Sequence, residues 1–414
     1  MDVAIIGGGI VGLTTALSLA RAGIRPVIYE AVTELRPLGV GINLLPHAVR
    51  ELAELGLLEE LRTIGMEIEG LGYFMADGRA VWDEARGLAA GYRWPQVAIH
   101  RGRLQLFLRN KVVEALGVDA LRTGHALDRF EEQGGKVSLT FRNGATAQAD
   151  VLIGADGIHS AVRRQLYPAE GRPKWNGVSL YRSTTRVPAA DFLPRMLWAG
   201  HSEQKFIAYP IAREGDEIVL NWVCDLRTRE AGTEPPEDWN RTIDRAALVP
   251  HYRDWRWQGT DIPAILEASG EVYEFPMVDR DPLQRWSFDR VTLAGDAAHP
   301  MYPIGSNGAT QGIIDARVLA FHIATVPDVA TALTQYEEAR REPTSAIVLG
   351  NRAQGPDMVL EVARQRASDP AIDLETAVPL AERVEIAASY KKLAGFDPAS
   401  LNARQSWSVP VETT

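Results

Sequence analysis

The chain has 414 residues, 46% hydrophobic and 24% charged, a composition typical of a soluble protein large enough for two packed lobes. Its formal net charge of −10 argues against a broad phosphate-binding surface, so we expect no nucleic-acid partner. The single cysteine, Cys224, excludes an intramolecular disulfide and a thiolate-rich metal site. We therefore expect no metal and a reducing, cytoplasmic location.

No membrane attachment is expected. Charged residues such as Arg21 and Glu30 interrupt the apolar stretches before the roughly 20 residues that a membrane helix requires. No basic segment precedes the first apolar run, so this run does not have the pattern of a signal peptide.

The first thirty residues have the pattern of a βαβ unit. Residues 2–6 form a short apolar run that predicts a strand, and residues 13–20 have apolar side chains at helical spacing. Gly23 follows as a helix C-cap would, and residues 25–30 predict a second strand. Such a unit is the building block of dinucleotide-binding folds.

A GxGxxG motif, formed by Gly7, Gly9 and Gly12, joins the first strand to the helix. The first glycine permits the tight turn, the second lets a pyrophosphate approach, and the third lets helix and strand pack. Glu30 ends the second strand, where its carboxylate can accept hydrogen bonds from an adenosine ribose and would repel a 2′-phosphate. The tightly bound nucleotide is therefore predicted to be FAD or NAD(H); the alternative is a glycine turn that serves packing alone.

The remaining elements predict two interleaved lobes. Residues 103–116 predict a long helix, and a β-meander with glycine-containing turns follows at 126–131, 136–142 and 146–153. Alternating strands then predict an antiparallel sheet, which the distant hairpin at 72–84 would join; these strands are 179–187, 205–209 and 217–223. A buried strand at 290–293 and a helix at 313–325 return to the first lobe.

Two further motifs carry a family resemblance. Residues 153–157, of sequence IGADG, with Ser160 and Arg163 after them, closely resemble the DG motif of the class A flavin monooxygenases, the para-hydroxybenzoate hydroxylase family. Residues 295–300, of sequence GDAAHP, resemble the family's GD motif, which holds the ribityl chain of the flavin. Residues 36–44, 99–105, 275–282 and 301–315 look most like the branch that contains phenazine-carboxylate monooxygenases.

The resemblance implies an α/β fold: a Rossmann-like FAD-binding lobe, an interleaved antiparallel β-sheet substrate lobe and a helical C-terminal segment. The expected division is 1–71, 95–175 and 284–330 for the FAD-binding domain, 72–94 for a substrate-domain hairpin, 176–283 for the substrate-binding domain and 331–414 for the C-terminal segment.

The same resemblance implies the residues that bind FAD. Asp296 can hold ribityl hydroxyls, and the glycine-rich backbone before the helix at 313 offers N–H groups to the flavin. Arg101 matches the family arginine that contacts FAD. The full expected set is Gly7, Gly9, Ile10, Val11, Gly12, Glu30, Ala31, Gly41, Arg101, Gln105, Asp156, Gly295, Asp296, Pro303, Gly305, Asn307 and Gly308.

For the substrate, an apolar wall with a few polar groups is expected. Its candidates are Tyr181, Arg182, Tyr209, Asn221, Trp222 and Pro303, with Arg182 and Asn221 able to orient a carboxylate or hydroxyl. His299 lies in the GD motif, where a structural hydrogen bond is the expected role, and we assign no catalytic base.

The resemblance implies a single-component monooxygenase that hydroxylates a small aromatic or heteroaromatic substrate, with or without loss of a ring carboxylate. In the family, NAD(P)H reduces the flavin, O2 adds to it, and a C4a-hydroperoxide transfers oxygen to the ring. Only Arg36 stands where para-hydroxybenzoate hydroxylase has paired arginines for nicotinamide nucleotide and flavin. The family has no separate domain for NAD(P)H and this chain contains one GxGxxG, so the co-substrate, NADH in preference to NADPH, is expected to bind transiently in a cleft. The expected assembly is a monomer or homodimer.

Other functions on the same fold stay open. They are a flavin-dependent oxidase, dehydrogenase or reductase, and a non-catalytic FAD-binding sensor. A halogenase is disfavoured, because residues 255–257 begin like the halogenase WxWxIP motif but continue differently.

Overall fold

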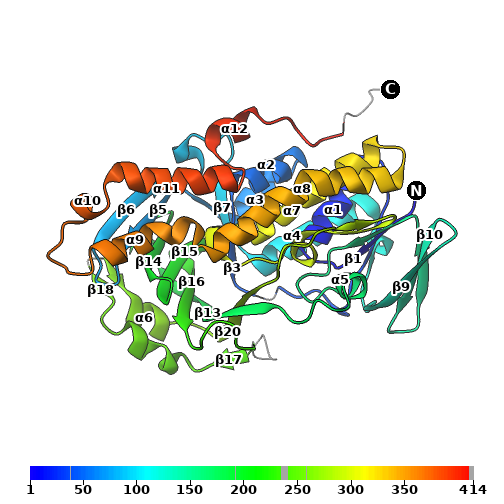
Figure 1. The fold of residues 1–414 in the computed structure, drawn as a ribbon. Coiled ribbons are helices and arrows are strands. Elements are labelled where there is room, and N and C mark those ends of the chain that lie inside the picture. Colours follow the sequence, from blue (N-terminus) through cyan, green and yellow to red (C-terminus); the bar gives the residue numbers. More distant parts are fainter. Residues whose placement is uncertain (38, 192, 235–240, 258, 410–414) are drawn as a thin grey trace.

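Two sheets organise the chain in the computed structural model, which describes residues 1–414 except 38, 192, 235–240, 258 and 410–414 (Figure 1). The first sheet has six strands, all parallel apart from its edge strand β21. In spatial order they are β21 (Ser287–Phe288), β22 (Val291–Leu293), β12 (Val151–Gly154), β1 (Val3–Ile6), β2 (Val27–Tyr29) and β8 (Leu121–Arg122).

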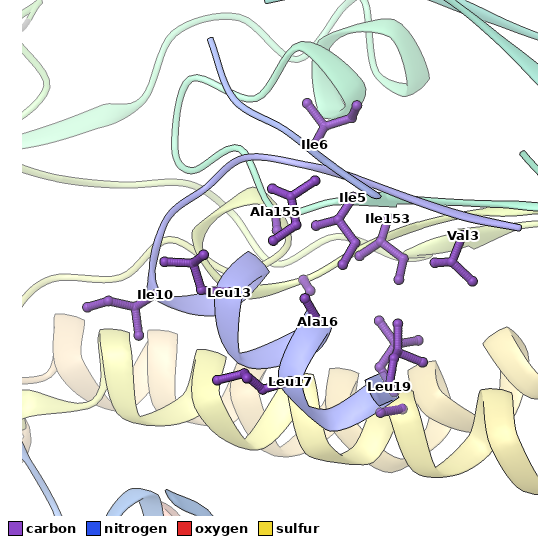
Figure 2. Packing of buried hydrophobic residues seen from close by; sticks show 14 of the residues in the cluster. Val3, Ile5, Ile6, Ile10, Leu13, Ala16, Leu17, Leu19, Ile153 and Ala155 are labelled. Carbon is purple, nitrogen blue, oxygen red and sulfur yellow. The ribbon is translucent and has the colours of Figure 1, made fainter. Parts of the chain in front are cut away.

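The centre of this sheet is apolar on both faces, as a parallel sheet covered by helices requires. All four residues of β1 are buried. Helix α1 (Ile10–Arg21) packs between β1 and α7 (Gly308–Thr325), with Leu13 and Ala16 turned toward the strands (Figure 2). The βαβ unit predicted from the first thirty residues is confirmed.

The second sheet has eight strands and forms the other lobe. In spatial order they are β17 (Arg241–Ile243), β20 (Val272–Asp279), β13 (Lys174–Pro188), β16 (Glu217–Arg227), β15 (Gln204–Glu214), β14 (Arg195–His201), β5 (Gly70–Phe74) and β6 (Ala80–Ala85). The distant hairpin β5–β6 joins the sheet, as expected, and β5 pairs parallel with β14 in the otherwise antiparallel sheet. We retain the division into sequence segments as a proposal.

Smaller elements complete the fold. Strands β3 (Gly41–Leu44), β7 (Gln96–His100) and β4 (Gly65–Ile68) form one small sheet, β11 (Thr146–Ala149), β10 (Lys136–Phe141) and β9 (Leu127–Gln133) another, and β18 (Arg256–Trp257) pairs with β19 (Thr260–Asp261). The remaining helices before α7 are α2 (Pro46–Glu54), α3 (Leu58–Ile64), α4 (Arg101–Leu116), α5 (Ala161–Leu166) and α6 (Ile262–Glu267).

The C-terminal segment is helical, as expected. It consists of α8 (Val329–Arg352), α9 (Met358–Arg366), α10 (Leu374–Ala377), α11 (Leu380–Leu393) and α12 (Pro398–Ala403). Helices α8 and α11 run along one side of the molecule and span both lobes (Figure 1). None of the helices in the described part of the chain has the length and apolar character that a membrane crossing requires.

Two predicted elements differ from the structure. The strand expected at 146–153 is two strands, because the chain changes partners at Asp150: β11 pairs antiparallel with β10, and β12 pairs parallel with β1. The helix expected from 313 begins at Gly308 and so includes Gly312, where a Cβ would lie 2.5 Å from Cγ2 of Val11 on α1.

Candidate active site

A groove of about 740 Å³ runs along the carboxyl edge of the parallel sheet. Its walls come from the residues that follow β1, β2, β12 and β22, including Gly9, Glu30, Asp156 and Asp296. Ligands of open α/β sheets bind at this edge, where neighbouring strands end and helices begin.

The three glycines of GxGxxG have different physical roles here. Gly7 has a φ of +109°, and a Cβ on it would lie 2.4 Å from the carbonyl oxygen of Ala155. A Cβ on Gly12 would lie 2.0 Å from the carbonyl oxygen of Gly7, whereas a Cβ on Gly9 would have nothing within 4 Å. Gly7 and Gly12 are therefore required by the protein's own packing, and Gly9 leaves space in the groove.

Glu30 and Gln105 hold the glycine turn from two sides. The Glu30 carboxylate accepts from the Gly8 N–H at 2.6 Å through Oε2 and from the Val32 N–H at 2.9 Å through Oε1. The Gln105 side chain donates to the Gly8 carbonyl oxygen at 2.8 Å. Both side chains line the groove, so these hydrogen bonds join the ends of β1 and β2 in one wall.

Asp296 and Arg101 are charged side chains that face the groove without a hydrogen-bond partner among the described residues. Burial raises the pKa of Asp296, against the opposing effects of His299 and Arg101. Burial also lowers the pKa of Arg101, although the side chain stays cationic. Both residues are exposed and line the groove, so each is available to a ligand.

Two helices also begin at the groove. Neither α1 nor α7 has a side-chain cap at its N-terminus, and Ile10 and Gly308 line the groove where the helices start. Free N–H groups and the positive end of the helix dipole favour an anion there. The two helix starts, Arg101 and the space at Gly9 fit a pyrophosphate, and Asp296 fits hydroxyl groups.

A smaller cavity of about 70 Å³ adjoins the groove. Arg182 lines both spaces, and Pro303 and Gly305 from the segment after the GD motif form one wall of the cavity. The opposite wall is one face of the eight-stranded sheet, with mostly apolar residues such as Leu180, Ile207, Val223 and Met277. Apolar walls with a few polar groups are the kind of lining that small-molecule sites have.

Comparison with known proteins agrees with this geometry. The sequence pattern of the FAD binding domain family matches residues 1–350. The chain belongs to this family. FAD is therefore its cofactor, and the large groove is where the described residues fit that group.

Related proteins are hydroxylases and monooxygenases by name. Phenazine 1,6-dicarboxylic acid hydroxylase PhzS of Lysobacter antibioticus is 42% identical over 364 residues, covering 85% of this chain and 89% of that protein. The 3-amino-4-hydroxybenzoate 2-monooxygenase PtnB3 of Streptomyces platensis is 33% identical over 413 residues, covering 97% and 98%. The resemblance to class A FAD-dependent aromatic hydroxylases, including the phenazine branch, is confirmed, and the chain is an enzyme of this group.

The fold agrees as well. A salicylate hydroxylase solved as a substrate complex has a TM-score of 0.77 with this structure at 22% identity, covering 100% of this chain and 99% of that chain. The predicted α/β fold with an interleaved antiparallel sheet and a helical C-terminal segment is confirmed.

The DG motif connects to the GD motif through a buried arginine. Asp156 lines the FAD groove, but its carboxylate accepts from the Ser160 hydroxyl at 2.5 Å and the Ala161 N–H at 2.6 Å, which caps α5. Arg163 on α5 donates to the carbonyl oxygens of Ala297 and Ala298 at 3.1 and 2.9 Å. The capped helix thus fixes the position of the GD segment.

Most of the predicted cofactor residues lie in the groove. Those that line it are Gly7, Gly9, Ile10, Val11, Glu30, Ala31, Arg101, Gln105, Asp156, Asp296 and Gly308. Pro303 and Gly305 line the substrate cavity instead.

The other predicted cofactor residues line neither space and act through packing. A Cβ on Gly295 would lie 2.7 Å from Cγ2 of Val11, close to the Gly12 turn. Asn307 is buried and donates to the hydroxyl of Tyr390 at 2.8 Å.

Three predicted substrate residues meet at Gly41, where the groove and the cavity adjoin. The Gly41 carbonyl oxygen accepts from Arg182 at 2.7 Å and from the Tyr209 hydroxyl at 2.9 Å. The Gly41 N–H donates to Oδ1 of Asn221 at 2.6 Å. Arg182 and Tyr209 line the substrate cavity, whereas Asn221 serves this backbone contact.

Tyr181 and Trp222 are corrections to the expected substrate wall. Both are buried in the hydrophobic core on the opposite face of the sheet. The Tyr181 hydroxyl donates to Glu274 at 3.2 Å, and the indole N–H of Trp222 donates to Thr185 at 3.1 Å. Successive residues of a strand point to opposite faces, so neither can share the cavity with its neighbour Arg182 or Val223.

Several lining residues were not predicted. His125, Ala126 and Leu127 follow β8 and line the FAD groove, together with Arg142. The signal that identifies the first three is their place after a parallel strand, because residues there collect at one edge. Lys205 and Asp225 line the substrate cavity.

Asp315 anchors the GD segment from inside α7. Its Oδ2 accepts from the Gly295 N–H at 2.9 Å and lies 2.5 Å from Nε2 of His299, and Oδ1 accepts from Arg340 at 2.7 Å. Burial opposes ionisation, but His299 and Arg340 outweigh it and lower the pKa of Asp315 to about 2. His299 therefore makes a structural hydrogen bond, as expected.

We predict that Asp315→Asn lowers the free energy of unfolding by about 3–5 kcal/mol at neutral pH, because it leaves Arg340 as a buried cation without its carboxylate. The folded-state pKa lies below the unfolded value of about 3.9, so this stabilisation is present above about pH 4 and is lost as the pH falls toward 2. Urea unfolding across this range measures the effect. Glu338→Gln, at an exposed carboxylate on α8, is the control; equal stability of the two variants at neutral pH contradicts the prediction.

Proposed function

We propose that the chain is a single-component monooxygenase that uses NAD(P)H and O2 to hydroxylate a small aromatic or heteroaromatic substrate. The observation that carries the proposal is the mainly apolar cavity that shares Arg182 with the FAD groove. The relatives named for hydroxylation of phenazine dicarboxylic acid and of an aminohydroxybenzoate support an aromatic ring as the substrate.

The protein's part in this reaction is placement and exclusion of water. FAD, when bound, supplies the electron transfer from NAD(P)H and the activation of O2. Leu180, Ile207, Val223 and Met277 form apolar walls that would limit the water near the reacting atoms. Arg182 offers the cavity a positive charge, where it can attract a substrate carboxylate or phenolate.

For the nicotinamide donor we propose NADH in preference to NADPH. The net charge of −10 provides no general attraction for the additional phosphate of NADPH. The donor would approach the flavin transiently, as a co-substrate.

The experiment combines NADH and NADPH oxidation by the FAD-loaded protein with oxygen uptake, peroxide assay and product mass spectrometry, over a panel of phenols and aromatic carboxylates. We expect one class of compound to accelerate NADH oxidation and to gain an oxygen atom; the product mass also shows whether a carboxylate is lost. Turnover that yields peroxide alone supports an oxidase. Absence of turnover with every compound supports a reductase or a sensor.

A further inference from the structure

Three charged side chains from different parts of the chain line the substrate cavity. Lys205 on β15, Asp225 on β16 and Asp357 just before α9 are each 3% exposed. Nζ of Lys205 lies 3.0 Å from Oδ2 of Asp225 and also contacts Oδ2 of Asp357. One cation between two carboxylates leaves the cluster with a net negative charge.

Part of this cluster has a structural role. The contact of Lys205 with Asp357 attaches the C-terminal segment to the sheet. Burial lowers the pKa of Lys205, but the two carboxylates outweigh burial and raise the pKa above its ordinary value, so the lysine stays charged. This role uses Oδ2 of Asp225 and leaves its Oδ1 unexplained.

Oδ1 of Asp225 is buried without a hydrogen-bond partner in the described part of the chain. A buried carboxylate oxygen without a donor carries a large desolvation cost. A bound molecule that brings an N–H or O–H group to this oxygen removes that cost.

Trp198 gives a second, independent indication of a ligand. It lines the same cavity, is 5% exposed, and packs edge-on against Tyr73 with ring centroids 5.5 Å apart. Its indole N–H is also buried without a partner among the described residues, although buried tryptophans usually find one. Asp225 and Trp198 thus both line the cavity, and each has one buried polar atom without a partner among the described residues.

We infer that Asp225 is a specificity-determining residue: its Oδ1 accepts a hydrogen bond from an N–H or O–H substituent of the substrate ring, and the Trp198 indole donates to an acceptor of the same substrate. This inference rests on the proposed function. The negative charge at Asp225 repels an anionic substituent, which is therefore oriented toward Arg182 on the FAD side of the cavity.

Matched ligand pairs test the inference through binding, measured by the change in flavin absorbance of the FAD-loaded protein. The pairs are hydroxybenzoates with their methyl ethers, aminobenzoates with their N,N-dimethyl derivatives, and hydroxyphenazine with methoxyphenazine. We expect the donor-bearing member of the preferred pair to bind about tenfold or more tightly, as a hydrogen bond to a charged acceptor implies.

The variant Asp225→Asn should abolish this preference and leave FAD binding unchanged. Because Lys205 offers only donors, the amide oxygen would face it, and an N–H group would replace the acceptor Oδ1. Asp216→Asn, in the exposed turn between β15 and β16, is the matched control and should keep the preference.

Three results overturn the inference. They are equal binding of methylated and unmethylated ligands to the unaltered protein, an unchanged preference in Asp225→Asn, and no change in flavin absorbance with any ring that carries an N–H or O–H group. If a methylated compound binds as tightly as its unmethylated partner and is hydroxylated, the inference fails while the proposed function stands. If the preference holds but no compound gains oxygen, the proposed function fails and the binding site stands.

Discussion

Replacing Asp296 with alanine is expected to lower FAD affinity by about 10- to 150-fold, which corresponds to a charged hydrogen bond of about 1.5–3 kcal/mol. The Asp296 carboxylate faces the groove and has no hydrogen-bond partner in the described part of the protein. Its loss therefore removes an acceptor that only the bound FAD would use. The stability of the FAD-free protein should therefore stay unchanged.

Titration of the FAD-free protein with FAD, followed by flavin fluorescence, measures this affinity, and thermal unfolding without FAD measures the stability. Asp119→Ala, at an exposed carboxylate far along the chain from the motif, is the control. Normal FAD affinity of Asp296→Ala would refute the assignment of this residue to the cofactor site.

The second prediction separates two glycines of the same motif. Gly12→Ala would place a methyl group 2.0 Å from the backbone oxygen of Gly7. Because backbone cannot move aside as a flexible side chain can, we expect a loss of at least about 3 kcal/mol in the free energy of unfolding, together with loss of FAD binding.

Gly9→Ala should behave differently. Gly9 has an extended backbone conformation that any residue adopts, and its added methyl group would meet no protein atom within 4 Å. The FAD-free protein should keep its stability to within about 0.5 kcal/mol, while FAD affinity falls because the methyl group occupies the groove. Urea unfolding and FAD titration of both variants test this contrast, and equal destabilisation of the two variants would contradict it.

The spacing of the motifs along the chain was sufficient to predict which residues gather at the groove. Gly9, Glu30 and Asp296 each come within three residues of the end of a parallel strand, and the carboxyl ends of such strands meet at one edge. A motif read along the chain therefore places its residues in space without knowledge of distant contacts.

The substrate half could be predicted only in part. Aromatic residues are favoured on either face of a strand, and sequence alone does not say which face covers the cavity. Arg182 and Tyr209 face it, whereas Tyr181 and Trp222 lie in the core behind it. The face that covers the cavity is set by the packing of the sheet against Pro303 and its neighbours, which are distant in sequence.

Buried charges were also invisible to sequence patterns. Lys205 and Asp225 lie on strands where charged residues usually mark a solvent-facing position. They are buried because Asp357, more than 130 residues further along the chain, completes the cluster from the C-terminal segment. Such a long-range ion pair has no local signature.

Turnover with isotopically heavy dioxygen tests the central claim most directly. The FAD-loaded protein is combined with NADH and the most active aromatic compound of the panel, and the mass of the product is measured by mass spectrometry. The account predicts that one heavy oxygen atom enters the aromatic product for each NADH consumed. A product without the label, with the oxygen recovered as hydrogen peroxide, would contradict it.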